Sequence, residues 1–159
     1  VPVFFDPGPE ILNIPRSWTK AIISSSKVVL LTYEEAEHLT QVKANPDEMT
    51  RIISDMGPDI VLLKLGPEGI VGRSSAEIVR QSGFNVTVRD TTGAGDSLLA
   101  SVAFTYLHGY SFEEMVTLAN GTGAACVQKL GAGVHAPSAE EILQVLTNSG
   151  INFSLKTET

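Results

Sequence analysis

The sequence predicts an α/β protein, a three-layer α/β/α sandwich in which helices cover both faces of a mostly parallel sheet. Two observations support this fold class. Residues 28–31 and 60–65 are continuous aliphatic runs, which are typical of strands buried on both faces of a parallel sheet. Strand patterns also alternate with helical patterns, and 43% of the 159 residues are hydrophobic, which is enough to fill one core.

Most of the strands are expected in the first half of the chain. The first strand ends at the turn-forming residues 6–9, and the run 60–65 ends at the turn 66–69. Three shorter strands, forming a hairpin system, are expected after that turn. The expected strands are 3–5, 28–31, 60–65, 70–72, 77–80 and 85–88.

Helices are predicted where apolar residues recur at helical spacing and where capping residues mark a first turn. Thr32 and Glu35 have the spacing of a capping box, and Ser138 is the expected cap of the last helix. Trp18 is expected to anchor the first helix in the core. The expected helices are 17–25, 34–42, 47–56, 95–107, 112–130 and 139–146.

One domain is expected over residues 1–147, followed by a polar tail over 148–159. Because the chain begins inside a strand, we expect it to be part of a longer protein. In sheets of this kind, ligands bind beyond the carboxyl ends of the strands. The loops 6–9, 32–35 and 66–69 each follow a strand, so we expect them to converge on one edge of the sheet.

Composition argues against several classes of partner. The net charge is −7 and no run of lysine or arginine occurs, so neither a nucleic acid nor an anionic membrane surface is expected as a partner. No stretch approaches about 18 consecutive apolar residues, so no membrane-spanning helix is expected. The single cysteine, Cys126, excludes an internal disulfide and favours a reducing compartment, for which we expect the cytoplasm, with an organelle as the alternative. The oligomeric state stays open, with a homodimer among the alternatives.

The segment from Asp90 to Asp96 has the pattern of a phosphate site. It leads from a predicted strand into Gly93-Ala94-Gly95, which opens a helix. A glycine-rich helix N-terminus offers unpaired N–H groups at the positive end of the helix dipole, and phosphate is its natural ligand. Two other phosphate motifs are absent. The chain has no Gly-x-x-x-x-Gly-Lys-Ser/Thr, and position 98 is leucine where a dinucleotide fingerprint requires glycine.

Asp96 lies in the first turn of this helix and has two interpretations. A carboxylate beside a phosphate is repelled, which makes sense if it accepts a proton from an attacking hydroxyl while the N–H groups stabilise the transferring group. Asp96 is then the general base of a phosphoryl transfer. Alternatively, Asp96 only complements the positive end of the helix. The Gly-Ala-Gly run in front of it favours the first interpretation.

The motif Asp-Thr-Thr-Gly-Ala-Gly-Asp-Ser, residues 90–97, resembles the C-terminal signature of the PfkB (ribokinase-type) carbohydrate kinases. Segment 5–9 resembles the Asp-Pro strand end of that family, 64–69 its Leu-Gly-x-x-Gly nucleotide loop, and 118–132 the helix and loop that border the adenine. The resemblance implies a ribokinase-like fold. Since members of the family are much longer, it also implies that this chain corresponds to their C-terminal, nucleotide-binding half.

The same resemblance implies ATP-dependent phosphorylation of a hydroxyl of a sugar or nucleoside, with Mg²⁺ as a cofactor. Asp96 would be the base, and Gly93, Ala94 and Gly95 would form the anion hole. Glu35 matches the acidic end of a motif that organises Mg²⁺, and Asp90 and Thr92 match segments that hold a monovalent cation, K⁺, in many members. The residues implied to bind the nucleotide are Lys64, Gly66, Gly69, Thr92, Asn120 and Gly131.

Two features keep a second function open. Thr32 stands where the magnesium motif of the family usually has asparagine, and the family's early Gly-Gly-Asn segment, its lid and its sugar-binding aspartate have no counterpart in the chain. The alternative is therefore a catalytically incomplete kinase-fold fragment that acts as a nucleotide-binding, regulatory or interaction protein.

Overall fold

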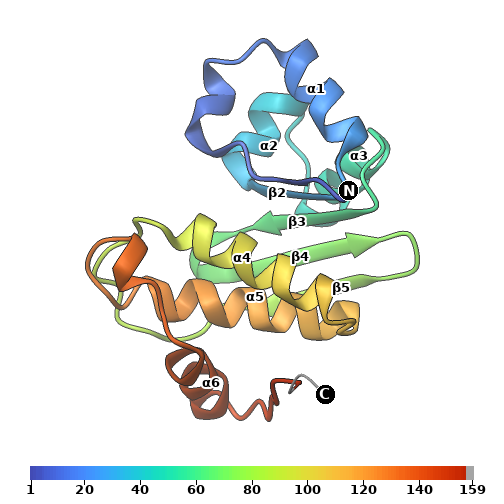
Figure 1. The fold of residues 1–159 in the computed structure, drawn as a ribbon. Coiled ribbons are helices and arrows are strands. Elements are labelled where there is room, and N and C mark those ends of the chain that lie inside the picture. The colour runs from blue at the N-terminus through green and yellow to red at the C-terminus, as the bar shows by residue number, and fades with distance from the viewer. Residues whose placement is uncertain (157–159) are drawn as a thin grey trace. The chain divides into compact units, whose positions relative to one another are not determined.

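The two aliphatic runs form the centre of a five-stranded sheet (Figure 1). The computed structural model describes residues 1–156, and the chain forms two compact units, Val1–Ser82 and Gly83–Thr159. The whole sheet belongs to the first unit, and its strands follow one another in chain order. They are β1 (Phe4–Phe5), β2 (Val28–Thr32), β3 (Ile60–Lys64), β4 (Gly69–Ser74) and β5 (Ile78–Ser82).

Strands β1, β2 and β3 pair in parallel, and β4 and β5 continue the sheet with antiparallel pairing. The residues Val28–Leu31 and Val61–Leu63 are fully buried, so both faces of β2 and β3 are covered, as their aliphatic runs predict. Parallel pairing also places the carboxyl ends of the first three strands at the same edge of the sheet. The loops that follow these strands therefore share that edge, as expected from the sequence.

Three helices cover one face of this sheet. They are α1 (Arg16–Ser25), α2 (Tyr33–Thr40) and α3 (Pro46–Ser54), and two short 3₁₀ helices, η1 (Gly8–Leu12) and η2 (Gly66–Glu68), follow β1 and β3. The core packs helix side chains against alternate strand residues, which are Val29, Leu31, Val61 and Leu63. The predicted capping box of Thr32 and Glu35 is present at the start of α2. The prediction for Trp18 is wrong, because its side chain is 67% exposed.

The second unit contains the other three helices, α4 (Ala94–Leu107), α5 (Phe112–Cys126) and α6 (Ala139–Asn148), and the 3₁₀ helix η3 (Gly133–His135). Helix α5 packs against both α4 and α6. A Cβ atom added at Gly121 would lie 2.8 Å from Cδ2 of the buried Leu146, so this glycine lets α6 approach α5 closely. Ser138 caps α6, as predicted. No helix within residues 1–156 is long and apolar enough to cross a membrane.

Two predicted elements differ in the structure. Residues 85–88 form no strand, although apolar and polar residues alternate there, because no neighbouring strand pairs with them. The backbone N–H groups of Arg89 and Asp90 instead donate to the carbonyl oxygen of Val127, at 2.7 and 3.2 Å. The helix predicted over 112–130 ends at Cys126, because the chain turns there toward Gly131, whose φ is +80°.

Residues 149–156 form no helix or strand but pack against Tyr110. The ring of Phe153 stacks on the ring of Tyr110 with 5.9 Å between the centroids. The Tyr110 hydroxyl accepts a hydrogen bond from the backbone N–H of Lys156 at 2.6 Å, and the ammonium of Lys156 lies 4.3 Å from the centre of the same ring. The final residues of the predicted polar tail, 157–159, lie outside the described residues.

Candidate active site

The N-terminus of α4, where the sequence predicts an anion site, has no side-chain cap. Gly93 precedes the helix in the left-handed conformation, with φ +76°, and provides no side-chain cap. The N–H of Ala94 donates to the carbonyl oxygen of Thr91 at 3.2 Å. The N–H groups of Gly95 and Asp96 follow in the first turn, where the helix itself supplies no acceptor. Within the described residues, α2, α3, α5 and α6 all fill this position with a side-chain cap.

A second loop lies against Gly93 and leaves no room for a side chain there. A Cβ atom built on Gly93 would lie 2.7 Å from Cβ of Ala132, closer than real Cβ contacts allow. Both the positive φ and this contact require glycine at position 93. The loop through Gly131 and Ala132 therefore helps to shape the backbone that opens α4.

The carboxylate of Asp90 ties these two loops together. Its Oδ1 accepts hydrogen bonds from the Thr92 hydroxyl at 2.7 Å and the Thr92 N–H at 2.9 Å, and its Oδ2 accepts from the N–H of Gly131 at 2.8 Å. These donors, the Thr92 hydroxyl first, lower the pKa of the Asp90 carboxyl to about 2 from its ordinary 3.8. Asp90, Thr92 and Gly131 are thus three predicted site residues that the structure brings together.

Cys126 lies behind this loop and is almost fully buried. Its thiol lies 3.9 Å from the carbonyl oxygen of Thr92, and the hydroxyl of Ser97 lies 3.6 Å from its sulfur. The thiol therefore contributes weak polar contacts to both sides of the turn that carries Gly93. Asn120, the residue expected near the adenine, is buried on α5.

The Asp90 hydrogen bonds predict a specific pH dependence of stability. Because the folded state lowers the pKa of this carboxyl, the ionised form stabilises the fold at all pH values above about 3.8. That stabilisation is lost as the pH falls from about 3.8 through about 2. An Asp90→Asn variant lacks it, so its free energy of unfolding should lie below that of the unmodified chain at pH 6. The difference should shrink as the pH approaches 2.

Urea unfolding of the unmodified chain and of Asp90→Asn between pH 2.5 and 6 measures this difference, since the interval covers much of the pH range in which the Asp90 carboxyl titrates. The variant Thr92→Val removes the strongest donor and keeps the side-chain volume. In it, the pKa of Asp90, followed by carboxyl NMR, should rise toward 3.8. An unchanged pKa in Thr92→Val would contradict the assigned cause.

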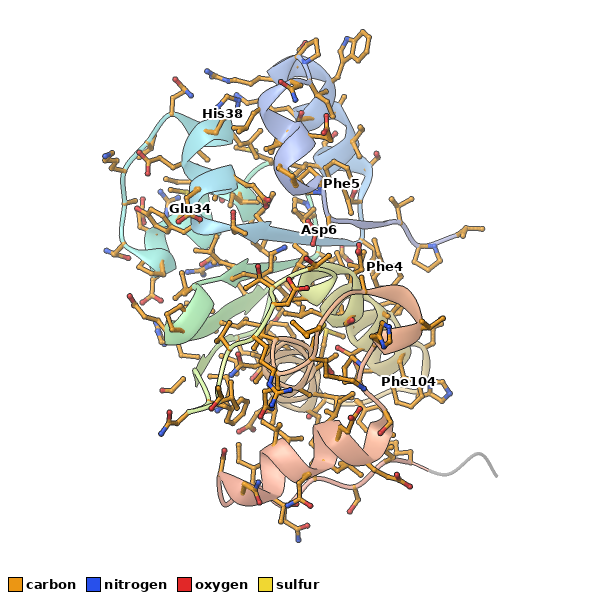
Figure 2. The ribbon with its side chains drawn as sticks, turned by 90° about the vertical axis from the view of Figure 1, so that its left-hand side faces the viewer. Phe4, Phe5, Asp6, Glu34, His38 and Phe104 are labelled. Carbon is orange, nitrogen blue, oxygen red and sulfur yellow. The ribbon has the colours of Figure 1, made fainter. Side chains whose placement is uncertain are left out.

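The other predicted residues belong to the first unit. Lys64 ends β3, and Gly66 and Gly69 frame η2 with φ values of +58° and +101°. The Lys64 ammonium forms an ion pair of 2.7 Å with Asp6. Asp6 directly follows β1 and is labelled in Figure 2. Segment 5–9 resembles the Asp-Pro strand end of the family, but the sequence assigns Asp6 no role among the predicted site residues.

Glu35 is buried and already takes part in the capping box. Its Oε2 accepts a hydrogen bond from the N–H of Thr32 at 2.8 Å. Within the described residues, no group of three or more His, Cys, Asp or Glu side chains could hold a metal ion. Mg²⁺ normally binds through one or two carboxylates together with substrate phosphates, so it fits a site completed by a nucleotide. The metal roles of Glu35, Asp90 and Thr92 stay predictions.

Comparison with known families decides the class of protein. The sequence model of the pfkB family carbohydrate kinases matches residues 1–139. The chain belongs to the pfkB family. A family relative, an uncharacterized sugar kinase of Archaeoglobus fulgidus, is 32% identical over 135 residues, which are 85% of this chain and 53% of the relative. The ribokinase of Mus musculus is 29% identical over 150 residues, which are 89% of this chain and 45% of the relative.

Solved pfkB-type structures have the same α/β fold. The structure of Arabidopsis thaliana ribokinase complexed with ribose and ATP matches with a TM-score of 0.78 and 29% identity, over 92% of this chain and 47% of that one. The ribokinase of Thermotoga maritima matches with a TM-score of 0.80 and 26% identity, over 92% and 49%. The chain therefore spans about half the length of the relatives that it matches. The predicted ribokinase-like fold is confirmed.

Proposed function

We propose that this pfkB protein uses ATP to phosphorylate a hydroxyl group of a sugar or nucleoside, with Asp96 as the general base. One observation carries the proposal. The N-terminus of α4 is opened by a glycine that gives no cap, and an exposed carboxylate lies in its first turn. A binding site alone would gain nothing from this carboxylate, because it repels a bound phosphate.

In this mechanism the chain supplies positioning and electrostatic stabilisation. The N–H groups of Gly95 and Asp96 donate toward the phosphoryl group that is transferred, and Gly93 and Ala94 keep the approach free of large side chains. The acceptor hydroxyl oxygen forms the new bond to phosphorus, and the bond to ADP breaks. The hydroxyl proton passes to the carboxylate of Asp96. The Asp90 hydrogen bonds keep the turn before α4 fixed during this step.

Each unit has its own candidate nucleotide-binding residues. Lys64, Gly66 and Gly69 are the candidates from the first unit, and Thr92, Asn120 and Gly131 those from the second. Mg²⁺ would neutralise charge on the nucleotide phosphates, with Glu35 as the acidic group proposed to organise it. A K⁺ ion beside Asp90 and Thr92 is part of the proposal for the same loop.

Sugars are the acceptors that the names of the relatives support best. The relatives include ribokinases and an ATP-dependent 6-phosphofructokinase of Thermoanaerobacterium thermosaccharolyticum, which is 26% identical over 127 residues. The solved Arabidopsis ribokinase contains both ribose and ATP. We therefore propose a pentose or hexose derivative first and a nucleoside second.

A second candidate function is a nucleotide-binding or regulatory protein without kinase activity. The observation that favours it is length, since the chain spans only about half of each relative. Thr32, in place of the family's usual asparagine, points the same way, because its side chain is used to cap α2.

Isothermal calorimetry of the 159-residue chain with ATP and Mg²⁺ tests the nucleotide site. We expect saturable binding with one site per chain. A screen of pentoses, hexoses and nucleosides with the full-length protein, read out as ADP release, then tests phosphoryl transfer. Binding of ATP without transfer to any acceptor would favour the second candidate. Absence of ATP binding would contradict the nucleotide site of this chain and would favour an incomplete or regulatory role.

A further inference from the structure

Asp6 and Lys64 form an unusually well-buried ion pair at one edge of the sheet. The Asp6 Oδ2 and the Lys64 Nζ lie 2.7 Å apart, and their side chains are only 12% and 15% exposed. Other ion pairs of the described residues, such as Arg51–Glu48 and Arg80–Asp47, leave roughly half of each side chain exposed. Because a buried pair must lose the hydration of both charges, it is weak evidence for stability by itself.

The carboxylate of Asp6 is fixed on both sides. While Oδ2 contacts Lys64, Oδ1 accepts a hydrogen bond from the N–H of Gly8 at 3.1 Å. That bond ties the carboxylate to the turn that follows β1. Lysine is a compact charge on a flexible stem, so a fixed carboxylate restricts where its ammonium can lie.

The pair lies at the edge of the sheet where ligands bind in parallel α/β proteins. Asp6 directly follows β1 and Lys64 is the last residue of β3, so both belong to the shared carboxyl edge. Gly66, which opens the proposed nucleotide loop, comes just after Lys64. The ammonium of a lysine has three N–H donors. Among the described residues, the hydrogen-bond partner of the Lys64 ammonium is the carboxylate of Asp6.

We propose that Asp6 is a positioning residue that holds the Lys64 ammonium ready to donate to a phosphate oxygen of the bound nucleotide. The inference rests on the proposed function, and it adds a role for Asp6 that the site motif does not contain. The alternative is a purely structural role, in which the ion pair links the ends of β1 and β3 across β2 and affects only stability.

Four variants of the 159-residue chain separate these two roles. They are Asp6→Asn, Lys64→Met, the double variant with both changes, and Lys64→Arg. Each is measured for its unfolding midpoint in urea and for its dissociation constant for ATP with Mg²⁺. Removing one partner leaves a buried charge uncompensated, so both single variants should unfold at lower urea. Removing both charges should restore much of the midpoint.

The ATP measurement decides between the roles. If Lys64 contacts a phosphate, the affinity for ATP should fall about tenfold or more in Lys64→Met and should stay low in the double variant, although its stability recovers. Asp6→Asn, which keeps the ammonium but releases it, should weaken binding less. Lys64→Arg, which keeps the charge, should retain most of the affinity.

Lys27→Met is the matched control. Lys27 pairs with Asp59, and these residues precede β2 and β3 at the opposite, amino edge of the sheet. The substitution changes the net charge by the same amount as Lys64→Met and should leave the affinity for ATP unchanged. An equal loss of affinity in both lysine variants would overturn the inference, because it would show a general charge effect.

Two further outcomes distinguish this inference from the proposed function. If the unmodified chain binds ATP and the double variant binds it equally well, the pair is structural and the inference is wrong, while the nucleotide site stands. If the unmodified chain does not bind ATP, both the nucleotide site and the inference are overturned.

Discussion

If Asp96 is the proposed general base, replacing it by asparagine is expected to slow turnover of the full-length protein by roughly 10²- to 10⁴-fold, the usual contribution of such a group. The amide keeps the shape of the side chain but cannot accept the proton of the acceptor hydroxyl. Asp96 is exposed in the first turn of α4, so its substitution should disturb packing little. Steady-state rates of ADP release give turnover, and calorimetry gives the affinity for ATP, which should change little.

Glu140→Gln is the matched control for this substitution. Glu140 is also an exposed acid in the first turn of a helix, α6, but that helix begins with a side-chain cap. The control should keep normal turnover. Near-normal turnover in Asp96→Asn would remove Asp96 from the role of base and would leave the helix-complementing interpretation in its place.

Replacing Gly93 by alanine should damage both the fold and the site. An L-residue in the left-handed region costs about 1–2 kcal/mol in stability. At position 93 the new Cβ would also lie 2.7 Å from Cβ of Ala132. One of the two loops must therefore move, which displaces the N–H groups of α4 from the phosphoryl group. We expect turnover to fall by roughly 10- to 100-fold, since the loss of one well-placed donor alone costs about that much or more.

Gly109→Ala separates backbone strain from the clash between the loops. Gly109 follows α4 at its other end with φ +64°, and a Cβ atom added there meets nothing within 4 Å. Both variants carry a similar cost of left-handed backbone, so the chain with Gly93→Ala should have the lower free energy of unfolding in urea. Adding Ala132→Gly to Gly93→Ala should recover part of that stability. Equal unfolding midpoints for Gly93→Ala and Gly109→Ala would contradict the proposed contact.

Much of the fold could be predicted because the patterns that identify its strands and helix starts lie within short stretches of the sequence. The aliphatic runs at 28–31 and 60–65 identify strands buried on both faces, and these form β2 and β3. The capping residues Thr32 and Ser138 mark the starts of α2 and α6. The motif at residues 90–96 also predicted the open start of α4, because glycine is the residue that both permits a left-handed turn and withholds a cap.

The errors come from features that depend on distant neighbours. Alternation at residues 85–88 suggested a strand, but a strand exists only where another pairs with it. Trp18 has the helical spacing of a core residue, but the local pattern does not show whether another element covers its side chain, and in the structure it is exposed. The contact of Asp6 with Lys64 joins residues 58 positions apart, one directly after β1 and one at the end of β3, so no local spacing in the sequence predicts it.

The close packing of α6 on Gly121 has a practical consequence for recombinant expression. The match to the pfkB family ends at residue 139, where α6 begins. A protein truncated there would lose the buried Leu146 and uncover the part of α5 around Gly121 on which it packs, and Tyr110 would lose its partner Phe153. Expression boundaries for this pfkB protein should therefore follow the packing and run at least through Lys156, beyond the end of the match to the family.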